Sequence, residues 1–431
     1  MKADLVVLGF FTISALALFV GFVFIFLRWM SVDARARGSS KWIPAALFIG
    51  LPLIGGSIAG LLRAKIPITV AIIFVLPFIA IITWLLIRPK ISVNGKLQDA
   101  SIVLKHRLCW LCASAGIFAV ATPFCISFLV IGAARNPGLK STYDPITHRL
   151  DPLKISLGNG KVLTISDPKI DFGYTFEDVE FPAVDGKTLR GWLVPGKEPS
   201  SVAIITVHGS GEDRRGGFLR RLPVFHDAGY TVLLFDCRNY GASDGDGKGA
   251  SFGVNESRDV SSAADYLKRS RGYRRIVAVG FSQGAASAIM AAGKNSNIDG
   301  VIAEASYGDL NDFIGNAQRK YGFPHWLASL TVHMGYWRLN ARSTGTPLEA
   351  VAHISPRPIL LIHGTGDKAI PFQASQTLFA RAGQPKSLWL APKAGHGAVF
   401  AKHEQEYKQH VLGFLNTFFK LEKTETGQKS I

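Results

Sequence analysis

The sequence is poor in cysteine, poor in acidic residues over its first third, and without a basic stripe interleaved with aromatic side chains. Four cysteines in 431 residues do not make a disulfide framework. The C-x-x-C spacing of Cys109 and Cys112 lies inside an apolar segment, where it predicts small apolar residues of a helix and not a redox motif. Because no nucleic-acid-binding motif is present either, nucleic acid is not a predicted partner.

The positive charge of the chain is unevenly distributed. Residues 1–140 contain 14 lysines and arginines against 3 acidic residues, a net charge of +11, whereas the rest of the chain has a net charge of only +6. The excess lies around long apolar segments, which is typical of loops that flank membrane spans.

Four apolar segments in the first third have 20 or more residues without a charge. About 20 such residues are enough to cross a bilayer as a helix. The sequence therefore predicts a multi-pass membrane region over residues 1–135 and a lipid bilayer as a partner. The predicted spans are 5–27, 43–62, 66–87 and 108–132.

The loops between these segments predict an orientation. Nine lysines and arginines follow the first and third segments, against five on the other side. Since positive loops stay in the cytoplasm, the domain that follows the fourth segment is expected on the non-cytoplasmic side.

After the apolar region, residues 136–175 are rich in proline, glycine and polar residues and predict a linker, and residues 421–431 predict a polar tail. Between them, residues 176–420 begin with two runs in which apolar and polar residues alternate, one on each side of Asp185-Gly186. This pattern predicts a β-hairpin. Short apolar runs then alternate with helical patterns, so we expect an α/β fold with a mainly parallel sheet covered on both faces. Strands are predicted at 202–207, 231–236, 275–280, 299–304, 358–363 and 386–391, and helices at 217–229, 256–270, 283–293, 371–382 and 403–419.

One connection in this domain is unusually long. About fifty residues separate the strand ending near Glu304 from the strand starting at Pro358, where 2–6 residues are usual. The segment is aromatic-rich and partly helical in pattern, so a cap insertion is predicted over about 305–357.

A candidate nucleophile stands where the strand at 275–280 meets a helix. Residues 280–284, "GFSQG", match the G-x-S-x-G motif, in which flanking glycines allow a sharp turn that exposes the serine at the carboxyl edge of the sheet. Ser282 is the predicted nucleophile.

A serine hydroxyl needs a base, and the base needs an acid that orients it. His396, in "APKAGHGAVF", lies between the last predicted strand and the last predicted helix and is the predicted base, with His403 as second choice. Asp367, which follows the strand at 358–363, is the predicted acid, with Glu304 as its rival.

Other polar residues at strand ends have a structural interpretation. His208 and His363 precede glycines and are predicted to be turn or packing residues, and Asp236 is predicted to brace the turn that follows it. The four arginines of "DRRGGFLRR" at 213–221 are predicted to form a solvated helix face, with contact to anionic headgroups as the alternative.

Acyl transfer also needs donors for the oxyanion. The backbone N–H groups of Gln283 and of Ser210 or Gly211, in the glycine-rich segment "TVHGSGEDRRG", are the candidates. No metal or organic cofactor is implied, and "SDGDGKG" at 243–249 predicts a flexible turn and not a cation loop.

These residues resemble the α/β-hydrolase superfamily over about 175–420. The matching segments are "HGSG", "DCRNYG", "GFSQG", "HGTGDKAIP" and "AGHG". Within the superfamily the pattern is similar to dipeptidyl-peptidase-like and membrane-anchored serine hydrolase branches, including acyl-protein thioesterase relatives. Asn239 departs from the commoner D-x-R-G-x-G pattern. The resemblance implies an α/β-hydrolase fold that acts through Ser282, Asp367 and His396.

The resulting hypothesis is a membrane-anchored serine hydrolase that forms an acyl-enzyme from an ester or thioester. The membrane region and the aromatic-rich insertion favour a lipid-like or acylated substrate. Two alternatives stay open, namely a serine peptidase or amidase acting on small peptides and a non-enzymatic, membrane-tethered binding module. A channel or transporter is disfavoured because the apolar segments contain almost no ionisable residues.

Overall fold

The computed structural model describes residues 162–198, 200–319, 325–341 and 345–421. It also describes the short strands β1 (Ser92–Val93), β2 (Lys96–Leu97), β3 (Tyr143–Asp144), β4 (Arg149–Leu150) and β5 (Leu153–Ser156). The four predicted membrane spans lie outside these residues. Among the residues described, no helix has the length and apolar character needed to cross a bilayer.

An eight-stranded sheet forms the centre of the domain, in the order β14-β13-β12-β11-β9-β10-β8-β7. The hairpin predicted around Asp185-Gly186 is present as the antiparallel pair β7–β8, and β8 also pairs antiparallel with β10. All other neighbours are parallel. The α/β-hydrolase fold with a mostly parallel sheet is therefore confirmed. The strands are β7 (Glu177–Pro182), β8 (Thr188–Val194), β9 (Val202–Val207), β10 (Thr231–Phe235), β11 (Arg275–Phe281), β12 (Gly300–Glu304), β13 (Ile359–Gly364) and β14 (Lys386–Ala391).

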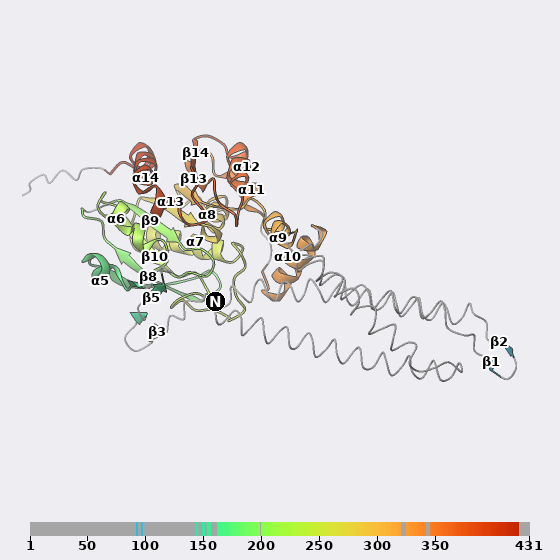
Figure 1. Cartoon of the computed structure of the whole chain (residues 1–431). Helices are drawn as coiled ribbons and strands as arrows, with labels where there is room; N and C mark the ends of the chain where they lie inside the picture. The colour runs from blue at the N-terminus through green and yellow to red at the C-terminus, as the bar shows by residue number, and fades with distance from the viewer. Residues whose placement is uncertain are drawn as a thin grey trace, which may run out of the picture. The chain divides into compact units, whose positions relative to one another are not determined.

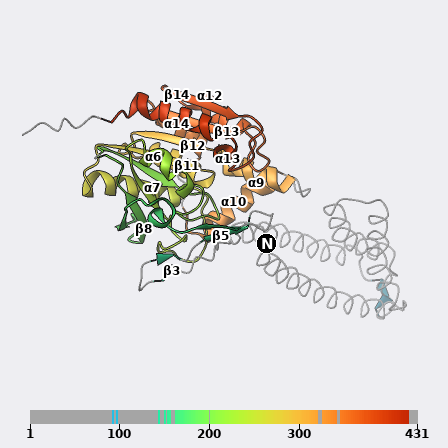
Figure 2. The same ribbon diagram turned by 60° about the vertical axis from the view of Figure 1, so that its left-hand side comes forward.

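Helices cover both faces of this sheet (Figures 1 and 2). Neighbouring strand residues point to opposite faces, so Ile205 belongs to one apolar cluster and Ile204 to the other. The first cluster includes residues of α7, α8 and α12, and the second includes residues of α6 and α14. The helices are α6 (Leu222–His226), α7 (Glu256–Asp265), α8 (Gln283–Ala292), α12 (Gln373–Arg381), α13 (Val399–Lys402) and α14 (Glu404–Phe418).

The range predicted as a linker includes β6 (Val162–Ile165), which pairs with β5, and the short helix α5 (Pro168–Phe172). The range predicted as a cap contains α9 (Leu310–Arg319), α10 (Trp326–Arg338) and α11 (Pro347–Ala350). A third apolar cluster joins α9 and α10 through Ile314, Ala328 and Val332.

The prediction of a solvated arginine face at 213–221 was wrong for three of the four arginines, and only Arg220 is exposed. Arg214, Arg215 and Arg221 are each no more than 3% exposed. Arg214 lies over the ring of Trp192 at 4.4 Å, and the other two form ion pairs with Asp213 and Glu304. In place of the predicted helix at 217–229 the structure has the 3-10 turn η1 (Leu219–Arg221) and the short α6. Buried charge needs partners, and the arginines obtain them by pointing inward.

Candidate active site

Ser282 lies at a sharp turn between β11 and α8. Its backbone has φ 54° and ψ −118°, a conformation that side-chain-bearing residues rarely adopt. The Ser282 N–H donates to the Glu304 carbonyl at 2.8 Å, which ties the turn to the neighbouring strand β12. Such strain persists only where surrounding contacts hold it, and it concentrates at functional sites.

The two glycines that flank the serine allow the turn to pack closely. A Cβ at Gly284 would lie 2.0 Å from the carbonyl oxygen of Val207, and a Cβ at Gly280 would lie 2.3 Å from that of Gly284. The first turn of α8 therefore sits directly against the end of β9. Both glycines of the G-x-S-x-G motif are therefore required in this chain, because any side chain there would clash with the backbone.

The structure brings Ser282, His396 and Asp367 together. His396 Nε2 lies 3.1 Å from Ser282 Oγ, and His396 Nδ1 lies 2.7 Å from Asp367 Oδ2. Because a carboxylate only accepts, Nδ1 carries the hydrogen, which leaves the Nε2 lone pair facing the serine hydroxyl. The imidazole is 29% exposed, whereas the Asp367 carboxylate is 1% exposed. A base open to a substrate and oriented by a buried acid can accept the serine proton.

The surroundings of Asp367 favour its ionised form. Burial raises the pKa of this carboxyl, but hydrogen bonds from His363, His396 and the Ile370 N–H outweigh it and hold the pKa well below its usual range. The Ala369 and Ile370 N–H groups donate to Oδ1 at 2.8 Å and 2.9 Å. The acid is thus charged and fixed in orientation.

His363 belongs to this arrangement, although the sequence predicted only a turn or packing residue. Its Nε2 lies 3.0 Å from the Ile370 carbonyl oxygen and 3.3 Å from Asp367 Oδ2, and its Nδ1 lies 2.7 Å from Ser375 Oγ. The carbonyl can only accept, so Nε2 carries the hydrogen and shares it with the Asp367 carboxylate. The available signal was its position, four residues before the acid at the end of β13.

The two rival residues take other partners. His403 Nε2 lies 2.8 Å from the Pro392 carbonyl, away from the serine. The Glu304 carboxylate pairs with the Arg221 guanidinium at 3.0 Å, and both are buried. His403 as the base and Glu304 as the acid are therefore wrong in this structure.

The glycine-rich segment 208–211 lies beside the serine turn. A Cβ at Gly209 would lie 2.9 Å from the Phe281 ring, and the Tyr240 hydroxyl lies 3.5 Å from Gln283 Oε1. Gln283 opens α8, where N–H groups have no partner within the helix. Ser210 is exposed, and Gly211 has φ 83°. Unpaired amides of this kind can bind a negatively charged oxygen.

Asp236 braces the loop after β10, as predicted. Its carboxylate accepts the N–H of Arg214 at 2.7 Å and that of Ala242 at 2.8 Å. Asn239 has φ 65°, a left-handed conformation that asparagine tolerates better than most residues. This explains how asparagine can stand at the position where the D-x-R-G-x-G pattern has glycine. The Asn239 side chain also binds the Gly247 N–H and the Gly249 carbonyl, which holds the 243–249 turn.

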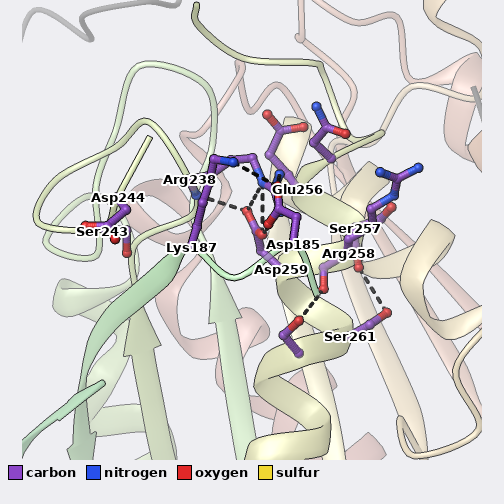
Figure 3. Close-up of polar contacts among 12 residues, drawn as sticks. Asp185, Lys187, Arg238, Ser243, Asp244, Glu256, Ser257, Arg258, Asp259 and Ser261 are labelled. Carbon is purple, nitrogen blue, oxygen red and sulfur yellow. Dashed lines mark hydrogen bonds and ion pairs between the residues drawn. The ribbon is translucent and has the colours of Figure 1, made fainter. Parts of the chain in front are cut away.

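Arg238 of the same loop ties two elements together (Figure 3). Its guanidinium contacts Asp259 of α7 at 2.6 Å and Asp185 of the β7–β8 turn at 2.8 Å. Burial raises the pKa of Asp185, but hydrogen bonds from Lys187 and the charge of Arg238 outweigh it and bring the pKa to about 2.

Residues 217–422 match the prolyl oligopeptidase family, and this range includes all three residues of the Ser282–His396–Asp367 arrangement. The domain has the α/β-hydrolase fold, with a serine, a histidine and an aspartate in the arrangement that serine hydrolases use. The hydrolase domain is 28% identical over 258 residues to the uncharacterized protein YqkD of Bacillus subtilis, a match that covers 56% of this chain and 81% of that protein. It is 23% identical to the uncharacterized peptidase YuxL of the same organism, over 56% of this chain and 38% of that protein.

Among solved structures, the domain is similar to the esterase Pf2001 of Pyrococcus furiosus. The two are 25% identical, with a TM-score of 0.49, over 58% of this chain and 94% of the esterase. Within the described part of the hydrolase, no group of three or more histidine, cysteine or acidic side chains is placed to hold a metal ion.

Proposed function

We propose that the protein is a serine hydrolase that cleaves an ester or thioester through an acyl-enzyme. The observation that carries the proposal is the continuous hydrogen-bonded chain from Ser282 Oγ through His396 to Asp367. The backbone N–H of Gln283 and that of Ser210 or Gly211 are the proposed oxyanion donors.

In the first step His396 Nε2 takes the Ser282 proton while Oγ bonds to the acyl carbon. The amides stabilise the negative oxygen of the tetrahedral intermediate. The bond to the leaving group then breaks, and the leaving group takes the proton from His396. In the second step water loses a proton to His396 and attacks the acyl carbon. The bond between the acyl carbon and Oγ then breaks and Oγ takes the proton from His396, which releases the acid and restores Ser282.

Hydrolysis of p-nitrophenyl esters by the full-length chain tests this proposal. Ser282→Ala removes the nucleophile and is expected to lower kcat by at least about 1,000-fold. The matched control is Ser287→Ala in α8, where the hydroxyl only donates to the Gln283 carbonyl, and this variant is expected to keep most of the activity. Ester hydrolysis that survives Ser282→Ala undiminished would contradict the proposal.

The substrate class is part of the same proposal. We favour a lipid-like or acylated substrate because of the apolar N-terminal third and the aromatic-rich segment 305–357. A peptide substrate is the second candidate, favoured by the match to the prolyl oligopeptidase family. A panel of acyl esters, acyl thioesters and aminoacyl anilides distinguishes them, since the favoured class is expected to have the highest kcat/KM.

We also propose that residues 1–135 anchor the enzyme in a bilayer with the hydrolase domain on the non-cytoplasmic side. The apolar segments and the distribution of lysine and arginine support this arrangement. Resistance of the full chain to alkaline extraction from membranes tests the anchor. A reporter fused after Lys140 tests the orientation, and activity of that reporter only in the cytoplasm would overturn it.

A further inference from the structure

A cavity of about 210 Å³ lies between α8 and the helices of the 305–357 segment. With about 30 Å³ for each water in the liquid, this volume suits a small organic molecule and not a long chain. None of the residues assigned to the triad or to the oxyanion amides lines it. Met290, one of its lining residues, stands eight residues after Ser282 on α8, about 12 Å along a helix.

Three aromatic side chains contribute to the walls of this cavity. Phe252, Tyr307 and Tyr336 line it together with apolar side chains that include Leu310 and Val332. The Tyr307 hydroxyl donates to the Phe252 carbonyl, so the two walls are fixed to each other. Aromatic faces carry partial negative charge and attract cations.

Two side chains at the cavity offer acceptor oxygens. Asp309 contributes a carboxylate, and only its Oδ1 is engaged among the described residues, by the N–H and the side-chain amide of Asn311. The Asn311 Oδ1 is buried without a hydrogen-bond partner in the described structure. The described lining contains no lysine or arginine, and His333 is its one histidine.

The charged groups near the cavity are also negative. Burial raises the pKa of Tyr336, and the negative charges of Glu256 and Asp309 raise it further. Glu256 is itself buried and is held by the Ser251 and Gly253 N–H groups. Acceptors, a carboxylate and aromatic faces are the features that bind an organic ammonium group.

We infer that this cavity binds the ammonium group of a small organic amine, with Asp309 as its counter-ion and Phe252, Tyr307 and Tyr336 as its aromatic walls. The inference goes beyond the hydrolase proposal, since it does not depend on Ser282 reacting. The amine belongs either to the distal end of a substrate or to a free effector, and the chemistry of recognition is the same.

Binding of benzylamine and of benzyl alcohol to full-length Ser282→Ala protein, measured by titration calorimetry, tests the inference. The two probes have similar shape and differ in charge. Benzylamine is expected to bind at least about tenfold more tightly. Asp309→Asn should remove most of that difference, because asparagine still accepts the Asn311 N–H at the start of α9 and lacks only the charge. Asp312→Asn, an exposed position of the same helix outside the cavity, should leave the difference unchanged.

A second variant keeps the test decisive if Asp309→Asn fails to fold. Tyr336→Leu removes an aromatic wall and is expected to weaken tetramethylammonium binding about fivefold, with little effect on benzyl alcohol. In the wild-type enzyme, competitive inhibition of ester hydrolysis by benzylamine would identify the amine as part of the substrate, whereas a change in kcat alone would identify an effector. Equal affinity for benzylamine and benzyl alcohol would overturn the inference, whether or not the enzyme hydrolyses esters.

Discussion

For single residues, the proposed chemistry depends on which atom carries each proton. The partners of His396 and His363 determine this, because a carboxylate and a carbonyl can only accept. Both imidazoles donate to the same acid, Asp367. The His396 side chain is partly exposed, whereas the His363 side chain is buried. The acid is therefore held by two side chains and two backbone amides.

The substitution Asp367→Asn tests the role of the charged acid. An amide in this position favours the wrong His396 tautomer, with the hydrogen on Nε2, so kcat is expected to fall by about 10,000-fold. Steady-state kinetics on an acyl ester, with circular dichroism to verify folding, measures this. A loss smaller than tenfold in a folded variant would contradict the proposed role.

The substitution His363→Phe tests whether the second imidazole supports the acid. Losing a hydrogen bond to a charged group is expected to lower kcat about tenfold. Because a donor to the carboxylate is lost, the pKa of Asp367 rises, so activity should disappear at a higher pH on the acid side than in the wild type. His363→Gln, which keeps a donor, should restore part of both effects.

The matched control for His363→Phe is His403→Gln. His403 bonds to the Pro392 carbonyl on the surface, so this variant should keep the wild-type pH profile. An unchanged pH profile for His363→Phe, despite a loss of thermal stability, would show that His363 only packs.

The three proposed catalytic residues could be chosen from the sequence because each lies at a strand end in a recognisable motif. The involvement of His363 could not, since it depends on how the loop after β13 folds back on that strand. The buried arginines were missed for a similar reason. Arg221 reaches Glu304 across 83 residues of sequence, and no local pattern signals such a pair.

For the secondary-structure elements, hydrophobic runs predicted the parallel strands to within a residue or two. The position of β8 between β7 and β10 could not be predicted from the sequence, because the order in which strands pair is a tertiary property. The helix predicted over 217–229 is shorter in the structure, and Arg221 at its start points into the protein interior whereas Arg220 is exposed.

The close packing of α8 on β9 gives a prediction at this scale. Gly284→Ala places a methyl group 2.0 Å from the Val207 carbonyl oxygen, and the free energy of unfolding is expected to fall by about 3 kcal/mol or more. Gly413→Ala is the control, because a Cβ there meets no atom within 4 Å and alanine favours the helix. Urea denaturation of the two variants measures the contrast, and equal stabilities would contradict the packing described.

The tie between the β7–β8 turn and Arg238 predicts a pH dependence. Because the folded-state pKa of Asp185 is lowered to about 2, its contribution to stability is present above about pH 4 and is lost as the pH falls through 4 toward 2. The stability difference between the wild type and Asp185→Asn should therefore shrink over that range. Asp178→Asn, at an exposed position of β7, serves as control. A difference that stays constant from pH 7 to pH 2 would refute the tie.

For the whole molecule, the chain combines an α/β domain with an N-terminal third that is strongly apolar and positively charged. Three apolar clusters account for the core of the hydrolase domain, and a short connection after each parallel strand delivers Ser282, Asp367 and His396 to one edge of the sheet. Residues separated by 85 and 29 positions in sequence meet there. The proposed reaction requires that the contact of Ser282 with His396, supported by Asp367, makes the serine reactive.

Labelling with a fluorophosphonate probe, followed by mass spectrometry of the modified peptide, tests this most directly. The probe reacts with a serine whose proton a neighbouring base can remove. We predict that full-length protein is labelled at Ser282 and that His396→Ala abolishes the labelling. A folded wild-type protein that stays unlabelled, or that is labelled at a different serine, would contradict the account.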